Sequence, residues 1–285
     1  MSRIDLVGVV GAGLMGSGIA EAAARGGFQV VVQEPEPAAL ERSRARIDAS
    51  VARAVSGGKL SGDEAEALIE RITWTDSIDD LAGAQLVIEA VFEDPAVKGP
   101  LFQQLDELVS PDAILASNTS SIPIAQLASW TERPERVIGL HFFSPVPVMK
   151  LVEVVVGLQT ASEVVERAEE FARAIAKRPI RTKDRSGFIV NMLLVPYLMA
   201  GVRMYEEGFA SREDIDDGMK LGAGHPMGPL TLCDFIGLDV LYAVCDSLYE
   251  EFKRPEYAPP PLLKRMVVSG QHGRKAGRGF YDYGT

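Results

Sequence analysis

Residues 7–27 read VGVVGAGLMGSGIAEAAARGG, and this stretch decides the fold of the first part of the chain. An apolar run enters a loop with Gly11, Gly13 and Gly16 in G-x-G-x-x-G spacing, and an alanine-rich helical stretch follows. A second apolar run ends at Glu34, 18 residues beyond Gly16. Such glycines permit a tight turn and a close approach to a pyrophosphate, and the helix N-terminus stabilises that anion. The stretch therefore predicts a dinucleotide-binding βαβ unit.

The acidic residue that ends the second apolar run indicates which dinucleotide binds. A carboxylate about 20 residues after the glycine loop accepts hydrogen bonds from the adenosine ribose hydroxyls. The same carboxylate repels a 2′-phosphate, and the EPEP sequence at residues 34–37 contains no arginine to reverse that preference. Glu34 therefore favours NAD over NADP.

Outward from this unit, β-branched runs alternate with helical stretches up to about residue 183. This alternation predicts further βαβ units and a mostly parallel sheet. A helical hairpin over residues 36–72 is inserted before the third strand. The seven expected strands contain IDLVGVV, FQVVVQ, QLVIEAV, AILASN, RVIGLHFF, KLVEVVV and RPIRT.

The remainder of the chain, from Ile189 onward, has a helical pattern. Charged, serine and glycine residues cluster at 184–187, which is typical of a domain boundary. We therefore expect an α/β domain with a Rossmann-type doubly wound sheet and inserted hairpin at residues 1–185. An all-α domain is expected at residues 186–285.

Composition and charge argue against several function classes. The net charge of −11 disfavours broad neutralisation of nucleic-acid phosphates. The longest nearly apolar run, Ile189–Val202, has 14 residues and contains Asn191 and Pro196, so we expect no membrane span. The N-terminus has no secretory signal pattern. Cys233 and Cys245 are not expected to pair, which favours a reducing, cytoplasmic location.

Two polar sequence features suggest a binding site: a polar segment after an expected strand, and an asparagine in an apolar helix. ASNTSS at 116–121 follows an expected strand, at the sheet edge where open α/β proteins hold ligands. One of its residues caps the next helix, but a cap does not need five polar side chains. Asn191 lies in the apolar helix FIVNMLLVPYLM, and its amide needs a partner if buried. That partner is either a backbone carbonyl or a ligand.

The stretch LHFFSPVPVMKLVEV at 140–154 holds one histidine and one carboxylate in apolar strands. Glu153 lies between Val152 and Val154, and a carboxylate buried without a partner is costly. Glu153 either faces water on an edge strand or pairs with His141 across the intervening turn. Such a pair would fix the tautomer of the imidazole and stabilise the imidazolium, as a proton-accepting histidine needs.

Together these stretches resemble the 3-hydroxyacyl-CoA dehydrogenase family, in particular its single-function short-chain members, nearly end to end. The resemblance implies NAD-dependent interconversion of (S)-3-hydroxyacyl-CoA and 3-oxoacyl-CoA, with 3-hydroxybutyryl-CoA as the expected substrate. The order and spacing of the motifs are specific, whereas the glycine loop alone is not. The motifs are GVVGAGLMGSGIA, VIEAVFED, ASNTSS, GLHFFSPVPVMKLVEVV, DRSGFIVNMLLVPYLM, KLGAGHPMGPLTLCDFIGLD and GRKAGRGFYDY.

The resemblance also implies residue roles. The family's catalytic histidine and its paired glutamate match His141 and Glu153. The serine that binds the substrate hydroxyl matches Ser120, and the asparagine from the helical domain matches Asn191. No metal ligand is implied. The implied cofactor contacts are Gly11, Gly13, Gly16, Glu34, Glu93, Lys98, Asn118 and, as a weaker match, Lys275.

The acyl carrier, the class of activity and the assembly stay open. The hairpin of many relatives has a denser set of lysines facing the CoA phosphates, whereas VARAVSGGKL here offers Arg53 and Lys59. The substrate is therefore an acyl-CoA, an acyl group bound to an acyl carrier protein, or another hydroxy acid. An alternative from another class is a non-catalytic dinucleotide-binding relative. The apolar content of 189–202 and 229–245, with the family habit, predicts a homodimer through the C-terminal helices.

Overall fold

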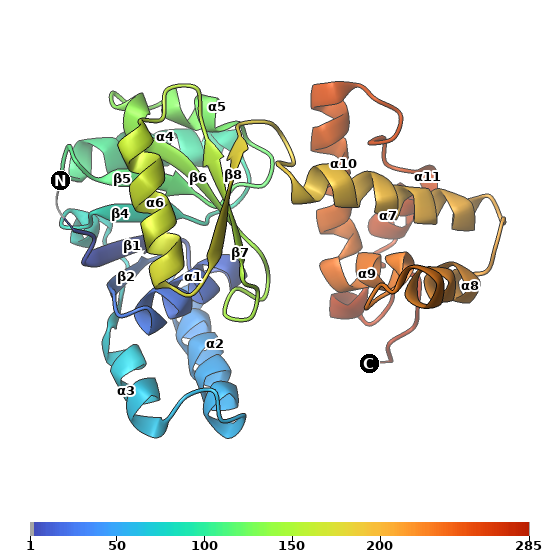
Figure 1. Ribbon diagram of the computed structural model, residues 1–285, viewed down its shortest axis with the longest axis horizontal. Helices are drawn as coiled ribbons and strands as arrows, with labels where there is room; N and C mark the ends of the chain where they lie inside the picture. The colour runs from blue at the N-terminus through green and yellow to red at the C-terminus, as the bar shows by residue number, and fades with distance from the viewer. Residues whose placement is uncertain (1–2, 285) are drawn as a thin grey trace. The chain divides into compact units, whose positions relative to one another are not determined.

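The computed structural model describes residues 3–284 (Figure 1). The chain divides between Arg185 and Ser186 into two compact units, each with its own apolar core. The first unit is a sheet with flanking helices, and the second is built from helices. The expected fold class, an α/β sheet followed by an all-α part, is confirmed.

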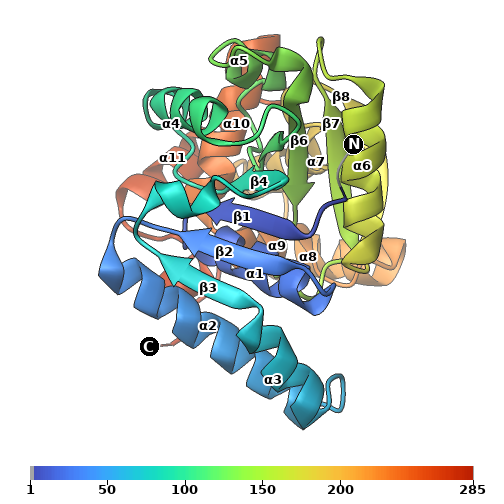
Figure 2. The ribbon, with the colours of Figure 1, turned by 90° about the vertical axis from the view of Figure 1, so that its left-hand side faces the viewer.

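Within residues 3–284, the sheet has eight strands in the order β3-β2-β1-β4-β5-β6-β7-β8 (Figure 2). All neighbouring strands are parallel except β6 and β7, which are antiparallel. The chain order reverses between β1 and β4, which creates the crevice where doubly wound sheets bind ligands. The strands are β1 (Leu6–Val10), β2 (Gln29–Gln33), β3 (Ile72–Thr75), β4 (Leu86–Glu89), β5 (Ile114–Ser117), β6 (Val137–Phe142), β7 (Leu151–Val156) and β8 (Arg178–Lys183).

The edge strand β3 differs from the sequence-based expectation, which ends the helical hairpin at residue 72 and expects no strand after it. Its four residues, ITWT, pair in parallel with β2 from Val30↔Ile72 to Gln33↔Thr75. Four residues are too few to show a two-residue period in the sequence. These residues therefore form a strand because their backbone pairs with β2, and not because of their own side-chain pattern.

Helices cover both faces of the sheet (Figure 2). On one face, Ile19 of α1 and Phe171 of α6 belong to the same apolar core as the inward side chains of β1 and β7. On the other face, a Cβ at Gly139 in β6 would lie 2.9 Å from Ile124 of α5. The helices are α1 (Leu14–Arg25) and α6 (Ser162–Ala174) on the first face, and α5 (Ile124–Ala128) on the second with α4 (Pro95–Leu108) beside it.

The inserted hairpin consists of α2 (Pro37–Ser56) and α3 (Gly62–Glu70). Ile47 of α2 is buried in the core that α1 shares, which anchors the hairpin to the sheet unit. Helix α3 begins with a capping box, in which Ser61 Oγ accepts from the Glu64 N–H and the Glu64 carboxylate accepts from the Ser61 N–H. Local sequence therefore sets the turn of the hairpin.

The second unit packs its helices around a separate core that includes Leu198, Leu241 and Leu263. Two buried carboxylates fix its loops. Asp216 accepts from the backbone N–H of Leu230, and Asp234 accepts from that of Phe280. None of the helices formed by residues 3–284 has the length and hydropathy that a membrane crossing requires. The elements are α7 (Val190–Glu206), α8 (Arg212–Asp217), the π-helical turn η3 (Gly218–Gly222), α9 (Pro229–Ile236), α10 (Leu238–Phe252) and α11 (Pro261–Val268).

Candidate active site

The candidate site residues of the first unit gather at one edge of the sheet. The glycine loop follows β1, Glu34 follows β2, and Glu93 follows β4. The 118–121 segment follows β5, and His141 lies near the end of β6. Because β2, β1, β4, β5 and β6 are parallel neighbours, their carboxyl ends meet at the same edge. The fold thus collects residues that are more than a hundred positions apart in the sequence.

The glycine loop has the conformation that a pyrophosphate site needs. Gly11 has φ +97°, a left-handed conformation that side chains disfavour. A Cβ at Gly16 would lie 1.8 Å from the Gly11 carbonyl oxygen, so only glycine allows α1 to start so close to the loop. The N-terminus of α1 is consequently open to an anion. These residues fit the pyrophosphate of a dinucleotide.

The loop opens into a cavity of about 760 Å³ that Glu34 also lines. One carboxylate oxygen of Glu34 accepts from the Ala12 N–H at 3.1 Å, and the other accepts from the Glu36 N–H at 3.3 Å. The carboxylate is therefore held beside the loop, where ribose hydroxyls of an adenosine can donate to it. The side chains of Arg42 and Arg46, from α2, line the same cavity.

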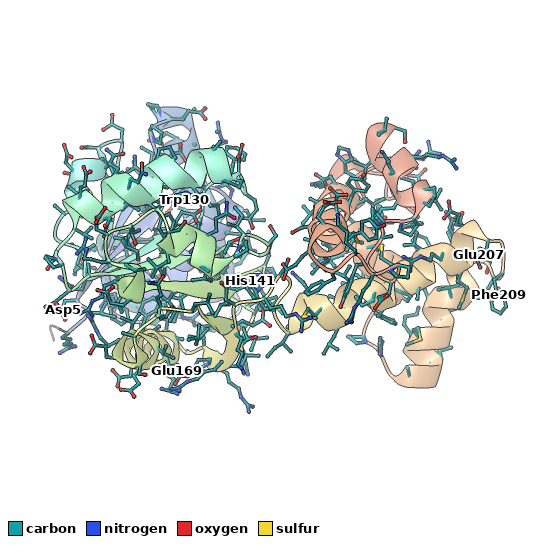
Figure 3. The ribbon with its side chains drawn as sticks, turned by 90° about the horizontal axis from the view of Figure 1, so that it is seen from above. Asp5, Trp130, His141, Glu169, Glu207 and Phe209 are labelled. Carbon is teal, nitrogen blue, oxygen red and sulfur yellow. The ribbon has the colours of Figure 1, made fainter. Side chains whose placement is uncertain are left out.

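His141 and Glu153 form the pair that the sequence raised as one of two alternatives. They are directly opposed across the antiparallel β6–β7 ladder, and His141 Nδ1 lies 2.7 Å from Glu153 Oε2. Glu153 is fully buried and His141 (labelled in Figure 3) is 7% exposed. Since the carboxylate accepts a hydrogen bond from Nδ1–H, the neutral ring carries its basic lone pair on Nε2. The solvent-facing alternative for Glu153 is wrong.

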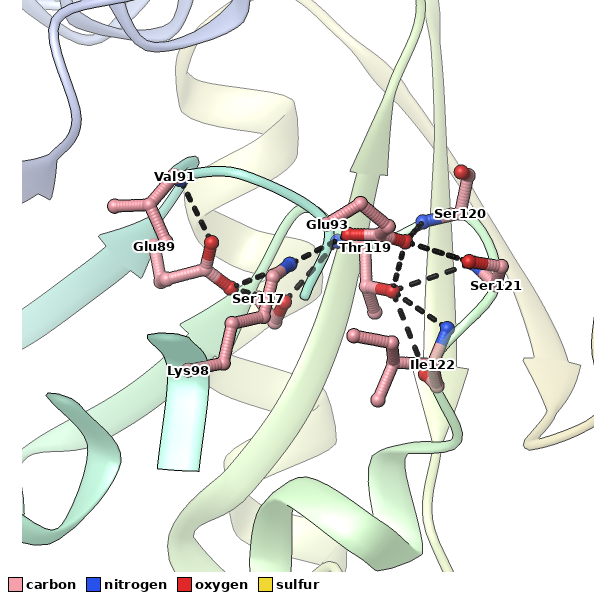
Figure 4. Close-up of polar contacts among 9 residues, drawn as sticks. All are labelled: Glu89, Val91, Glu93, Lys98, Ser117, Thr119, Ser120, Ser121 and Ile122. Atoms are coloured by element: carbon pink, nitrogen blue, oxygen red, sulfur yellow. Dashed lines mark hydrogen bonds and ion pairs between the residues drawn. The ribbon is translucent and has the colours of Figure 1, made fainter. Parts of the chain in front are cut away.

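A second buried ionic cluster links β4, α4 and the loop after β5 (Figure 4). The side chain of Lys98 is 1% exposed, and its ammonium lies 3.0 Å from a Glu89 oxygen and 2.6 Å from a Glu93 oxygen. Glu89 is fully buried and also accepts from Ser117 Oγ at 2.6 Å and from the Val91 N–H at 2.7 Å. Burial raises the pKa of Glu89, and the Lys98 ammonium and the Ser117 hydroxyl counter part of that rise.

Glu93 organises the polar loop itself. Its Oε1 accepts from the backbone N–H of Ser120 at 2.9 Å, from that of Ser121 at 3.0 Å, and from Thr119 Oγ1 at 2.6 Å. Burial opposes ionisation, but the Lys98 ammonium and these donors outweigh it and lower the pKa of Glu93 to about 2. In the structure, Glu93 and Lys98 therefore fix the backbone that presents the Ser120 side chain.

Asn118 joins this loop to the histidine strand. Its amide oxygen accepts from the Phe142 N–H at 2.9 Å, and its own N–H donates to the Glu89 carbonyl at 2.9 Å. These two bonds bridge β4, β5 and β6 at the site edge. One side-chain and one backbone hydrogen bond of Asn118 thereby set the relative positions of the polar loop and of His141.

Four further residues that the resemblance implicates lie elsewhere. Arg53 and Lys59 are exposed at the tip of the α2–α3 hairpin. Asn191 is half-buried in the first turn of α7, and Lys275 forms an ion pair with Asp239 at 2.6 Å, both within the second unit. No group of side chains suited to a metal ion is present in residues 3–284.

Sequence reasoning missed Glu89 and Ser117 as individual residues of the site. Glu89 ends the apolar strand LVIE, so the argument that a carboxylate in an apolar strand needs a partner applies to it as it does to Glu153. Ser117 is one of five polar residues in ASNTSS, and nothing in the sequence shows which of their hydroxyls faces Glu89. Sequence reasoning also missed Arg42 and Arg46 of α2, because they follow Glu34 by more than one helical turn.

A nucleotide-binding loop and a carboxylate-held basic imidazole share one sheet edge, and this defines the class: an NAD-dependent dehydrogenase. Family models then identify the family. The model of the 3-hydroxyacyl-CoA dehydrogenase NAD binding domain matches residues 6–185, and that of the 3-hydroxyacyl-CoA dehydrogenase C-terminal domain matches residues 187–283. The chain belongs to the 3-hydroxyacyl-CoA dehydrogenase family.

Individual relatives agree with this assignment. A 3-hydroxybutyryl-CoA dehydrogenase of Mycobacterium tuberculosis strain H37Rv is 55% identical over 98% of this chain and 99% of that protein. The crystal structure of FadB2 from Mycobacterium tuberculosis superimposes with a TM-score of 0.98 at 54% identity, covering 99% of this chain and 100% of that chain. The crystal structure of (S)-3-hydroxybutyryl-CoA dehydrogenase PaaH1 from Ralstonia eutropha gives a TM-score of 0.95 at 44% identity, covering 99% and 100%. The resemblance seen in the sequence is confirmed.

Proposed function

We propose that this protein interconverts (S)-3-hydroxyacyl-CoA and 3-oxoacyl-CoA, with 3-hydroxybutyryl-CoA as its substrate. The observation that carries the proposal is the His141–Glu153 pair, a basic imidazole at the same sheet edge as the nucleotide loop. The names of the Mycobacterium tuberculosis 3-hydroxybutyryl-CoA dehydrogenase and of the Ralstonia eutropha structure support the substrate class.

The cofactor that these residues suit is NAD. Gly11, Gly13, Gly16 and the start of α1 would hold its pyrophosphate, and Glu34 would accept from the adenosine ribose. Bound there, the nicotinamide supplies the hydride acceptor or donor at its C4. We further assign Glu93, Lys98 and Asn118 to the cofactor side of the site, and Lys275 as a weaker contact.

The side chains supply proton transfer and positioning. In oxidation, His141 Nε2 takes the proton of the substrate C3 hydroxyl, and the Glu153 carboxylate stabilises the imidazolium that forms. Ser120 hydrogen-bonds the C3 oxygen, and Asn191 holds the adjacent thioester region. In the reverse direction the imidazolium returns the proton to the C3 oxygen. Burial of Glu153 strengthens its interaction with the charged ring, because water screens it little there.

An assay of NADH absorbance with 3-hydroxybutyryl-CoA and NAD tests this proposal. The wild-type protein should produce NADH, and His141→Gln should lower kcat by about 10²–10⁴-fold, the usual worth of a general base. NAD binding without turnover of any 3-hydroxyacyl thioester would favour the non-catalytic alternative.

The carrier of the acyl group is proposed to be CoA, with Arg53 and Lys59 as candidate contacts of its phosphates. Both side chains are exposed on the α2–α3 hairpin, so their charges are open to an anionic ligand. Comparing acetoacetyl-CoA with acetoacetyl-acyl carrier protein separates the two carriers. Faster turnover of the carrier-protein substrate would overturn the CoA assignment.

We also propose a cytoplasmic homodimer formed through the second unit. Its helices leave large apolar side chains exposed: Leu193 is 72% exposed, Phe235 47% and Val240 47%. Such side chains are typical of an interface with another copy of the chain. Light scattering at micromolar concentration should give twice the chain mass of 30.8 kDa.

A further inference from the structure

Glu34 conceals a set of anion-binding groups inside the nucleotide cavity. Its two carboxylate oxygens accept from the N–H groups of Ala12 and Glu36. Among side chains, only a carboxylate offers two acceptor oxygens together with a full negative charge. Backbone N–H groups that hold a carboxylate can equally hold a phosphate oxygen. The local chemistry beneath Glu34 is therefore that of an anion site.

Helix α2 adds positive charge to the same cavity. Arg46 Nη1 donates to the Ala12 carbonyl and to Ser17 Oγ, each at 3.0 Å, and Ser17 Oγ donates to Ser43 Oγ at 2.9 Å. These bonds fix α2 against the glycine loop. The face of α2 that carries Arg46 is consequently held toward the nucleotide.

Arg42 lies on that face, one helical turn before Arg46. Residues four apart on a helix are neighbours, and both guanidinium side chains line the cavity. The side chain of Arg42 is 57% exposed and makes a 3.5 Å ion pair with Glu36, which is 61% exposed, and such a contact is worth little in water. Arg42 is thus able to turn to a stronger anion.

Arg44 provides an internal comparison. It lies two residues from both cavity arginines and projects to another side of α2, where its guanidinium stacks 4.8 Å from the Trp74 ring centroid. Its side chain is 49% exposed, close to the value for Arg42. Arg42 and Arg44 therefore have the same charge, lie on the same helix and are similarly exposed. They differ in that only Arg42 lines the cavity.

We infer that the cavity contains a latent site for the 2′-phosphate of NADP(H), made by Arg42 and the Ala12 and Glu36 N–H groups, which the charge of Glu34 alone keeps closed. The inference goes beyond NAD binding and rests on it. With Glu34 ionised, the carboxylates of Glu34, Glu36 and Asp76 face Arg42 and Arg46 around the cavity. Neutralising Glu34 balances the charges and weakens its hold on the two N–H donors, so that a phosphate can displace the uncharged side chain.

The test measures NADH and NADPH dissociation constants of the full chain by enhancement of cofactor fluorescence, so it needs no substrate. Glu34→Gln keeps the shape of the side chain and removes its charge. It should raise the affinity of NADPH relative to NADH by about tenfold or more, since a close like-charge contact costs at least about 1.4 kcal/mol. Adding Arg42→Gln should return most of that gain. Adding Arg44→Gln, the matched control, should change the ratio by less than about twofold.

Two results would overturn the inference. One is an unchanged NADPH-to-NADH ratio in Glu34→Gln. The other is an equal loss of the gain from Arg42→Gln and Arg44→Gln, which would mean that overall charge and not a phosphate site is responsible. Failure of the wild-type protein to bind NADH would instead overturn the nucleotide site on which the proposed function depends.

Discussion

Replacing Glu153 by glutamine should slow the oxidation of 3-hydroxybutyryl-CoA by about 10²–10³-fold in kcat. The substitution keeps the shape and a hydrogen-bonding oxygen 2.7 Å from His141 Nδ1, but it removes the charge that stabilises the imidazolium. Because Glu153 is fully buried, solvent does not replace that charge. Loss of about 2.7–4 kcal/mol of transition-state stabilisation corresponds to this range.

The pattern of kinetic constants distinguishes this role from a structural one. KM should change little, because Glu153 reaches the substrate only through His141. Both constants are obtained from NADH absorbance at one fixed pH, with folding checked by circular dichroism.

Glu163→Gln is the matched control. Glu163 forms an ion pair of similar length, 2.9 Å to Arg136, but its side chain is 45% exposed. Surface pairs contribute about 0–1 kcal/mol, so kcat should stay within about threefold of the wild-type value. A near-normal kcat for Glu153→Gln, or an equal loss in both variants, would refute the role assigned to the His141–Glu153 pair.

Three other predictions test the site and its support. Lys98→Met should destabilise the protein by about 3–5 kcal/mol in denaturant unfolding, because it leaves Glu89 buried without its cation; an unchanged unfolding midpoint would contradict this. The lowered pKa of Glu93 means that its stabilisation is complete above about pH 4.5 and is lost as pH falls toward about 2. Glu93→Gln should therefore flatten the decline of Tm in acid, and parallel Tm curves would count against it. Residues 1–185 expressed alone should bind NADH measurably but show no turnover, and substantial activity would exclude a role for Asn191.

The sheet and its nucleotide edge could be predicted because their determinants are local in the sequence. The glycine spacing and the end of the strand at Glu34 are read directly, since each follows from the geometry of one βαβ unit. Strand β3 could not be predicted, because its four residues are defined by pairing with β2. The local sequence pattern therefore predicts helices and strands that have their own hydrophobic periodicity. It misses a strand that forms only by pairing with a neighbouring strand.

The site shows the same division. His141 and Glu153 could be proposed as partners because one short turn joins their strands, which makes cross-strand contact a matter of register. The contacts of Glu93 with the loop at 119–121 could not be proposed, since they depend on the lateral order of β4 and β5. The alignment of Arg42 with Glu34 likewise depends on how α2 lies against the loop. Motif spacing alone holds no information on either arrangement.

The cluster of Glu89, Lys98 and Glu93 has a consequence for how the sequence can change over time. Its three charges come from β4, from the loop that follows it and from α4, and Lys98 contacts both carboxylates. Losing the ammonium alone leaves a buried carboxylate, whereas losing Lys98 and Glu89 together removes both sides of the interaction. We therefore expect strong epistasis, with a coupling free energy of about 0.5–3 kcal/mol in a Glu89→Gln, Lys98→Met double-mutant cycle. Substitutions at these two positions should be tolerated jointly and not singly.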